Sequence, residues 1–238
     1  MGKIILIGTE HGDLKGSGRL ESLLESVHPD ILSVEFSLES LQLSKNNPVD
    51  IAKIVSEAKE RRVSSTFITF LGDLIAKHGL TDFEYTASKS YADKHNITLY
   101  LADNPELASA CRNIKLDLLH KIILGLPANT EIPIPSEEQL INDTDKNYEF
   151  AVRAINREFP QTQLDKFLDG FRGILIGQRD TYMTQRIRQI STDSPDSVLA
   201  HVCCFAHLFD DSKGETIYSR IKDLSPERRL IYSPKLTP

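Results

Sequence analysis

Histidine and carboxylate side chains follow four short apolar segments of this sequence. Glu10 and His11 follow the first segment, Glu35 ends the second, Asp103 follows the third and His207 follows the fourth. Imidazole and carboxylate groups together suit a divalent cation such as zinc, manganese or iron. A metal held by them would lower the pKa of a bound water molecule and polarise a carbonyl group. The pattern is therefore typical of a hydrolytic site, provided that the four segment ends lie together in the fold.

The four apolar segments, and a fifth near the carboxyl terminus, are expected to be β-strands. Their runs of β-branched and aliphatic residues are typical of strands that are buried on both faces of a parallel sheet. In an open parallel sheet, ligands bind beyond the carboxyl ends of the strands, so this placement would collect the polar residues at one edge. The expected strands are Ile4–Ile7, Ile31–Phe36, Ile97–Ala102, Val198–Phe205 and Leu230–Tyr232.

Helical periodicity fills most of the chain between these strands. A helix over Arg19–Val27, with four apolar residues on one face, joins the first two strands and predicts a parallel pair with a right-handed crossover. Thr81 and Glu84 have the spacing of a capping box, so Glu84 is interpreted as a helix-capping residue. Further helical patterns cover residues 48–95, 105–126, 136–159, 161–190 and 214–224.

These elements predict a single α/β domain over residues 1–238. Its central, mainly parallel sheet would have about four to six strands flanked by helices. Helical elaborations are expected over about residues 48–95 and 136–192. Within the second, Gly170, Gly173 and Gly177 are interpreted as one small face that allows close packing of a helix against another helix or against a strand. The long helices between 136 and 190 would also suit a homodimer interface.

The pair Arg179-Asp180 is a further candidate for the site. It lies on a predicted helix that carries Met183 and Arg186 at helical spacing. An arginine that reaches the strand ends would bind an anionic group of a substrate or orient a carboxylate. The alternative is an ion pair on the protein surface.

Each polar residue also has a structural interpretation. His11 or His207 alone is as readily a structural histidine as a functional one, and Glu35 or Asp103 would serve as a cap for the helix that follows. His201 lies inside a strand and is expected to be a core residue. The other histidines lie on helical or linker stretches, and no function is expected for His28, His78, His95 and His120.

The composition limits the classes of partner that are expected. The chain has 238 residues, of which 40% are hydrophobic, and a formal net charge of −6, so nothing in the charge favours nucleic acid or an anionic membrane. No apolar run approaches the roughly 18 residues of a membrane span, and the amino-terminal apolar run is too short for a signal peptide. The three cysteines, Cys111, Cys203 and Cys204, show no zinc-pair spacing. A reducing, cytoplasmic location is expected.

Five short motifs resemble those of the TraB/PrgY/GumN group, which includes the TIKI-type metalloproteases. Gly8-Thr9-Glu10-His11 resembles its opening Gly-x-x-His motif, and Pro29-Asp30 through Glu35 resembles its Pro-Asp-hydrophobic-Glu strand. Tyr91–Asp103 resembles its alanine-bearing helix followed by a strand that ends in Asp. Arg179–Met183 resembles its Arg-Asp-x-x-Met helix, and Ser197–His207 resembles its closing strand with a second Gly-x-x-His motif. The haem-binding ChaN lipoproteins and the erythromycin esterases are a more distant resemblance.

The resemblance implies a metal-dependent hydrolase, in particular a peptidase acting on a peptide or small-molecule substrate. His11, Glu35 and His207 would hold or flank a manganese, cobalt or zinc ion, and Glu10 or Asp103 would serve as a general base or a supporting carboxylate. Arg179 would bind the substrate or stabilise developing negative charge.

The second motif departs from the expected pattern, because Cys204 stands where glycine is expected in Cys204-Phe205-Ala206-His207. Cys204 is itself a candidate soft metal ligand. The departure favours a second hypothesis, a regulatory protein that binds a peptide in the same pocket without turnover. A third hypothesis is haem binding, which no residue pattern selects.

Overall fold

The fold is a parallel sheet covered by helices, as predicted. The computed structural model describes residues 2–39, 83–110 and 135–233 except 174, together with positions 56, 57, 60, 121 and 125. Five parallel strands pair in the order β3-β2-β4-β1-β5. They are β1 (Ile4–Thr9), β2 (Ile31–Val34), β3 (Thr98–Leu101), β4 (Leu199–Cys204) and β5 (Glu227–Leu230).

The first four strands lie within one or two residues of their expected limits, whereas the fifth was placed wrongly. The sequence predicted a strand at Leu230–Tyr232, but β5 is Glu227–Leu230. Among the strands that the structure describes, it lies at the edge of the sheet and pairs only with β1. Edge strands carry charged side chains because solvent reaches them, so an apolar run is a poor marker of such a strand. Glu227 accordingly makes a salt bridge with Lys3 at 2.6 Å.

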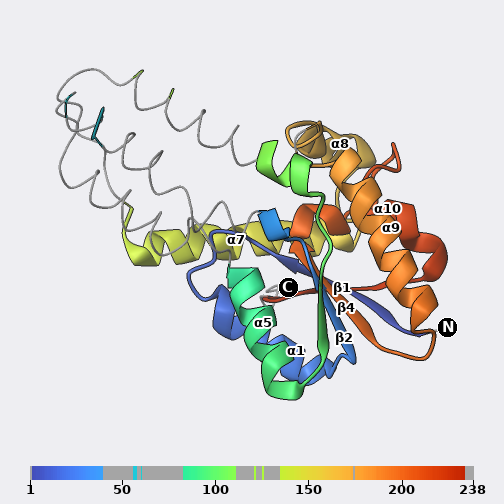
Figure 1. The fold of residues 1–238 in the computed structure, drawn as a ribbon. Helices are drawn as coiled ribbons and strands as arrows, with labels where there is room; N and C mark the ends of the chain where they lie inside the picture. Colours follow the sequence, from blue (N-terminus) through green and yellow to red (C-terminus); the bar gives the residue numbers. More distant parts are fainter. Residues whose placement is uncertain are drawn as a thin grey trace.

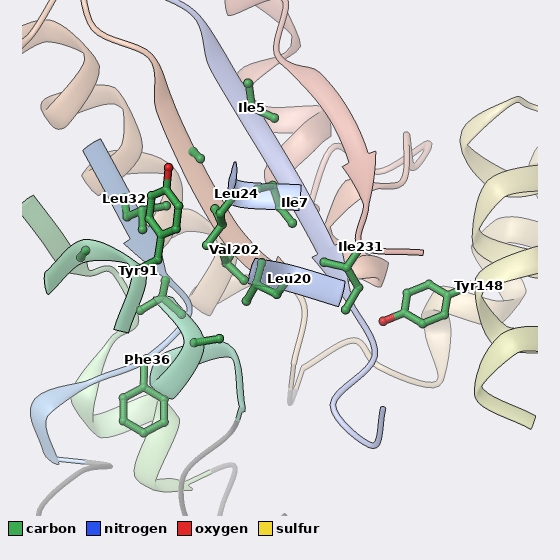
Figure 2. Close-up of a cluster of buried hydrophobic side chains, with 14 residues drawn as sticks. Ile5, Ile7, Leu20, Leu24, Leu32, Phe36, Tyr91, Tyr148, Val202 and Ile231 are labelled. Carbon is green, nitrogen blue, oxygen red and sulfur yellow. The ribbon is translucent and has the colours of Figure 1, made fainter. Parts of the chain in front are cut away.

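Helices cover both faces of the sheet (Figure 1). One face packs against α1 (Gly16–Val27) and α5 (Phe83–His95). The other packs against α9 (Gln178–Asp193) and α10 (Ile217–Ile221). Side chains alternate along β1, so that Ile5 and Ile7 point to α1 while Ile4 and Leu6 point to α9. Figure 2 shows the first of these clusters, with Leu20 and Leu24 of α1 beside Ile7.

The chain leaves neighbouring strands β1 and β4 on opposite faces of the sheet. After β1 it continues into α1 on one face, and after β4 it continues through η1 (Phe205–Leu208) to α10 on the other. Strands whose connections diverge in this way open a crevice at their carboxyl ends, which is where α/β sheets bind ligands. His11 lies in the loop that follows β1, and Cys204 is the last residue of β4, so both lie at this point of the sheet.

The predicted helix over 161–190 is two helices. After α7 (Glu137–Ile155), α8 (Gln161–Asp169) ends before Gly170, and α9 begins at Gln178. Gly173 and Gly177 have φ angles of 80° and 118°, which residues other than glycine rarely adopt. Apart from the adjacent residues, no atom of the described part of the chain would lie within 4 Å of a Cβ at either glycine. The interpretation of these glycines as a close-packing face was therefore wrong: they turn the chain between two helices.

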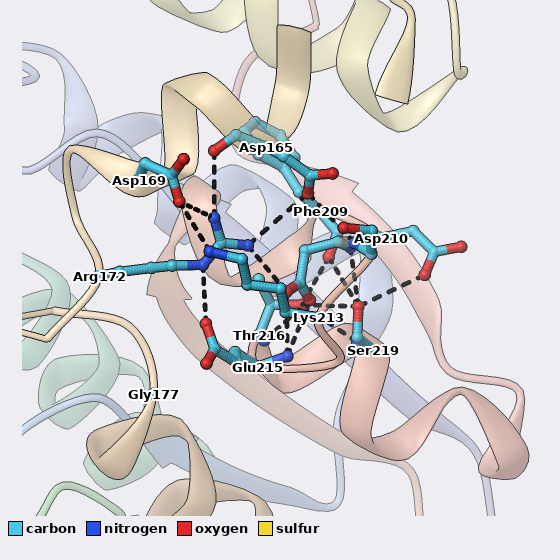
Figure 3. Close-up of polar contacts among 12 residues, drawn as sticks. Asp165, Asp169, Arg172, Gly177, Phe209, Asp210, Lys213, Glu215, Thr216 and Ser219 are labelled. Carbon is cyan, nitrogen blue, oxygen red and sulfur yellow. Dashed lines mark hydrogen bonds and ion pairs between the residues drawn. The ribbon is translucent and has the colours of Figure 1, made fainter. Parts of the chain in front are cut away.

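Arg172 fixes this turn to the segment that follows η1. Its guanidinium contacts four carboxylates, Asp165, Asp169, Asp211 and Glu215 (Figure 3). Asp211 in turn accepts backbone hydrogen bonds from Glu215 at 3.0 Å and from Thr216 at 3.1 Å. The network holds the entry to α9 against the exit from η1, and these two elements carry the polar residues discussed below.

The remaining predicted helices are described only in part. Residues 56, 57 and 60 are helical, as are 105–110, 121 and 125, but most of the expected helices over 48–82 and 111–126 lie outside the described residues. The helix expected over 136–159 is α7, and the one over 214–224 is α10 with the short η2 (Lys222–Leu224). Within the described part of the chain, no helix is long and apolar enough to cross a membrane.

Two glycines on α1 are predicted to respond oppositely to alanine. A Cβ at Gly16 would lie 2.4–2.6 Å from the Phe83 ring, so Gly16→Ala should destabilise the fold by about 1–3 kcal/mol through overpacking of α1 against α5. A Cβ at Gly18 meets nothing within 4 Å, so Gly18→Ala should stabilise the helix by about 0.5–1 kcal/mol. Urea unfolding of both variants measures the difference, and equal effects would contradict the packing of these helices.

Candidate functional site

His11 is paired with a buried carboxylate on α5. Because β1 ends at Thr9, His11 lies in the loop beyond the strand, and its Nδ1 is 2.9 Å from Glu84 Oε1. The Thr9 hydroxyl is 2.9 Å from the same oxygen. The Glu84 side chain is 4% exposed, whereas that of His11 is 33% exposed. A carboxylate fixed in the core therefore orients an imidazole that solvent can reach.

Cys204 completes this first group of residues. It is the last residue of β4 and lies opposite Thr9 in the register of β1 with β4. Cys204 is half-buried and lies near enough to the His11 imidazole to affect its pKa. Burial by itself lowers the pKa of His11, but Glu84 and Cys204 together raise it well above its usual value. His11 is therefore held as an imidazolium between a carboxylate and a thiol.

A second group surrounds Glu35, the residue that follows β2. Arg179, near the start of α9, donates from Nη2 to Glu35 Oε1 at 2.9 Å. The same guanidinium binds both oxygens of Asp103, with Nε to Oδ1 at 3.1 Å. All three residues are at least nine-tenths buried. The surface ion pair considered for Arg179 and Asp180 is thus replaced by a buried bridge between two strand ends.

His207 joins this second group from η1. Its Nδ1 is 2.7 Å from Asp180 Oδ1, and its Nε2 is 3.3 Å from Glu35 Oε2. Asp180 also accepts backbone hydrogen bonds from Ile217 at 2.8 Å and Gly177 at 3.1 Å. Burial lowers the pKa of His207, but Asp180 and Glu35 outweigh it and raise that pKa well above its usual value.

The pKa values of the two carboxyl groups bound to Arg179 shift in opposite directions. Burial raises the pKa of both. For Glu35 the charges of His207 and Arg179 overcome burial and hold the pKa well below its usual value. For Asp103 burial prevails, and with the charge of Glu35 it raises the pKa although Arg179 opposes it. Glu35 is therefore the fixed negative centre of this group, and it also accepts the backbone N–H of Cys204 at 2.9 Å.

His201 is a core residue, as expected. It lies within β4, is fully buried and has its Nδ1 2.7 Å from the Ser33 hydroxyl of β2. Burial lowers its pKa to about 3, so the ring is neutral at neutral pH. Its Nε2 has no hydrogen-bond partner in the structure as described.

Glu10 lies beside the first group without joining it. Its backbone N–H donates to the Tyr148 hydroxyl at 3.0 Å, and none of the described residues forms a hydrogen bond with its carboxyl group. Burial is the main cause that raises the pKa of this carboxyl, and the charges of Glu84 and Asp13 add to it. A general-base role for Glu10 stays a prediction.

The three expected metal ligands do not converge as a ligand group. Within the described ranges, no three His, Cys, Asp or Glu side chains are placed to hold a metal ion. Both oxygens of Glu35 and both nitrogens of His207 already have protein partners, while Nδ1 of His11 is paired with Glu84. The guanidinium of Arg179 already balances the negative charge of Glu35 and Asp103, which a metal ion would otherwise do. The residues as arranged do not fit a divalent ion.

Two carboxylates of the site were not identified from the sequence as site residues in their own right. Glu84 was interpreted as a cap with Thr81, a residue outside the described ranges, and Asp180 was considered only together with Arg179. Glu84 lies on the first turn of α5 and faces the core rather than solvent. Helical spacing gives no signal for this, because a buried and a solvated glutamate look alike in a single sequence.

Comparisons with known proteins give no match, whether with family models, with curated proteins or with solved structures. The resemblance to the TraB/PrgY/GumN group therefore depends on the short motifs alone.

Loss of the Arg179 charge should destabilise the protein strongly. Arg179→Met leaves the two buried carboxyl groups of Glu35 and Asp103 without their cation, which costs about 3–5 kcal/mol for a buried pair. Arg188→Met is the matched control on the same helix, because Arg188 pairs with Asp223 at the surface and such pairs contribute about 0–1 kcal/mol. Chemical denaturation compares the two, and a small effect of Arg179→Met would contradict a buried ionic bridge.

His207 should contribute a pH-dependent part of the stability. Its pKa is raised in the folded state, so its contribution is fully present below the unfolded pKa of about 6.5 and is lost as the pH rises above that value. His207→Gln should therefore cost more at pH 6 than at pH 9, with a change of up to about 1.4 kcal/mol per pH unit in this window. Urea titrations at several pH values measure it; a cost that grows with pH would contradict a charged His207.

Proposed function

We propose that this protein is a hydrolase that cleaves an acyl bond, an ester or an amide, in the crevice between the ends of β1 and β4. The observation that carries the proposal is the pair of Glu84 and His11, with Nδ1 2.9 Å from a buried carboxylate and the ring partly open to solvent. A carboxylate that fixes one ring nitrogen leaves the other to exchange a proton with a substrate.

The acid–base role follows from the charge of the pair. Because Glu84 and Cys204 raise the pKa of His11, the imidazole carries a proton at neutral pH. Such a group can donate a proton to the alkoxide or amine that leaves during acyl-bond cleavage. Thr9 holds Glu84 in place and so fixes the orientation of the ring.

The second group supports the site rather than reacts. Arg179 and His207 both contact Glu35, and His207 also contacts Asp180, all within the protein interior. Glu35 also accepts the backbone N–H of Cys204 and so holds the end of β4. Arg179 would bind substrate only by breaking these contacts, so the proposed substrate-binding role of this residue is replaced by a positioning role.

The substrate class is proposed from the crevice and from the sequence motifs together. A partly exposed imidazole suits a peptide or a small acyl compound that approaches from solvent. A divalent ion remains an expectation from the motifs alone, and no step here requires one. Peptide binding without turnover is the main alternative, and it is an outcome of the experiment below.

Removal of either member of the pair should abolish most of the activity. His11→Gln and Glu84→Gln should each lower kcat/KM about 10²–10⁴-fold, because each removes the positioned proton donor. A panel of nitrophenyl esters and fluorogenic peptides measures the rates. His95→Gln is the matched control, because His95 forms a similar pair with Glu25 at 3.1 Å on the surface and should leave the rates unchanged.

The same assay separates the alternatives. Rates that do not change after treatment with a chelator are expected, and loss of activity that manganese, cobalt or zinc restores would favour the metal-dependent reaction instead. A peptide that binds, as measured by calorimetry, but gives no product on long incubation would refute hydrolysis and favour the binding protein.

A further inference from the structure

We propose that the Cys204 thiol is the nucleophile of this site and that it carries the acyl group as a thioester between the two half-reactions. The inference rests on the proposed hydrolase function, which by itself leaves the nucleophile open. It assigns Cys204, His11 and Glu84 as one catalytic triad that spans β4, the loop after β1, and α5.

The sheet register places the three residues together. Thr9 of β1 lies opposite Cys204 of β4, and the Thr9 hydroxyl lies 2.9 Å from the Glu84 carboxylate. Two residues after Thr9 the chain turns His11 back onto the same carboxylate at 2.9 Å. Residues far apart in the sequence thus converge through strand pairing, at the point where the connections of β1 and β4 diverge.

The neighbouring cysteine shows what distinguishes Cys204. Adjacent residues of a strand point to opposite faces, and Cys203 is 1% exposed in the cluster with Ile4, Met183 and Leu208. Burial raises the pKa of the Cys203 thiol well above its usual value, so it is inert at neutral pH. Cys204 is half-buried and pairs with Thr9, so its side chain lies on the face of the sheet where Thr9 and His11 meet Glu84.

The backbone of Cys204 is held from behind. Its N–H donates to Glu35 Oε2 at 2.9 Å, and Glu35 is itself bound by Arg179 at 2.9 Å and by His207 at 3.3 Å. A nucleophile must keep its geometry to within a fraction of an ångström during attack, and a fixed support provides this. The buried ionic group therefore acts as the positioning element for the thiol.

The reaction balances with the groups present. The Cys204 sulfur attacks the acyl carbonyl carbon, while the thiol proton resides on His11. The tetrahedral intermediate expels the alcohol or amine, which takes that proton from His11, and a thioester remains on Cys204. Water then attacks the thioester, its proton passes to His11 and on to the departing sulfur, and the acid is released with the thiol restored.

The first experiment measures thiol reactivity without any substrate. The full chain is treated with limiting iodoacetamide at neutral pH in the presence of a chelator, and peptide mass spectrometry with fragmentation assigns alkylation to each cysteine. We expect Cys204 to react at least tenfold faster than Cys203. His11→Gln should slow Cys204 at least threefold, whereas the surface variant His95→Gln should not. Equal rates at Cys203 and Cys204, or an unchanged Cys204 rate in His11→Gln, would overturn the proposal.

The second experiment looks for the acyl-enzyme. The protein is mixed with an excess of an activated nitrophenyl ester, quenched in acid within seconds and analysed by intact mass and by peptide mapping. An acyl group on Cys204, preceded by a burst of nitrophenol, is expected in the wild type and in Cys203→Ala. Neither the burst nor the adduct should occur in Cys204→Ala, and far-ultraviolet circular dichroism checks that this variant is folded.

The outcomes separate the nucleophile from the function. Hydrolysis that persists in Cys204→Ala but is lost in His11→Gln would support the proposed hydrolase function and refute the role of the Cys204 thiol as nucleophile. A reactive, His11-dependent Cys204 in a protein that turns over no member of the panel would refute the hydrolase, and absence of the acyl adduct would then refute the nucleophile as well.

Discussion

The site depends on one buried carboxylate, that of Glu35. Its two oxygens take a guanidinium, an imidazole and a backbone N–H, which come from α9, η1 and β4. A charge taken out of water is tolerated only when it is paired and hydrogen-bonded on all sides. Each partner is therefore fixed to Glu35, and the three elements that carry them are fixed to the end of β2. The position of Cys204 at the end of β4 is a consequence of this constraint.

The environment, and not the residue type, decides what each histidine does. His201 and His207 are both fully buried and six residues apart, yet their pKa values move in opposite directions. His201 faces a serine hydroxyl and remains neutral, whereas His207 is flanked by two carboxylates and is charged. His11 has a carboxylate on one side and a thiol beside it, and it is the one of these three that solvent reaches.

The two groups of site residues lie on opposite sides of the sheet, with the supporting group on the α9 side and the proposed reactive group on the α5 side. On the α9 side, the glycine turn and the Arg172 network hold the start of α9 beside η1, so that Asp180 and His207 meet. On the α5 side, the packing of α1 against α5 brings Glu84 under the loop after β1. The two sides meet at Cys204, whose backbone N–H donates to Glu35 of the second group while the paired residue Thr9 contacts Glu84 of the first. Neither side contains the complete site, because the strand register joins them.

The amino-acid sequence by itself determined the parallel α/β fold and the edge of the sheet at which the polar residues gather. Apolar runs closed by polar residues are local signals, and the rule that ligands bind at strand ends applies to any parallel sheet. They identified His11, Glu35, Asp103, Arg179 and His207 as residues of that edge. They did not reveal that Arg179 occupies the place proposed for a cation.

The tertiary structure alone decided which of these residues meet, and it added Glu84 and the neighbourhood of Cys204. Helical periodicity distinguishes faces of a helix but not what covers them, so Glu84 looked like a cap. The charged edge strand and the glycine turn before α9 were misplaced for the same reason, since their conformation depends on neighbours distant in the sequence. A site made by strand pairing is non-local, and the pairing of Thr9 with Cys204 exists only in the folded chain.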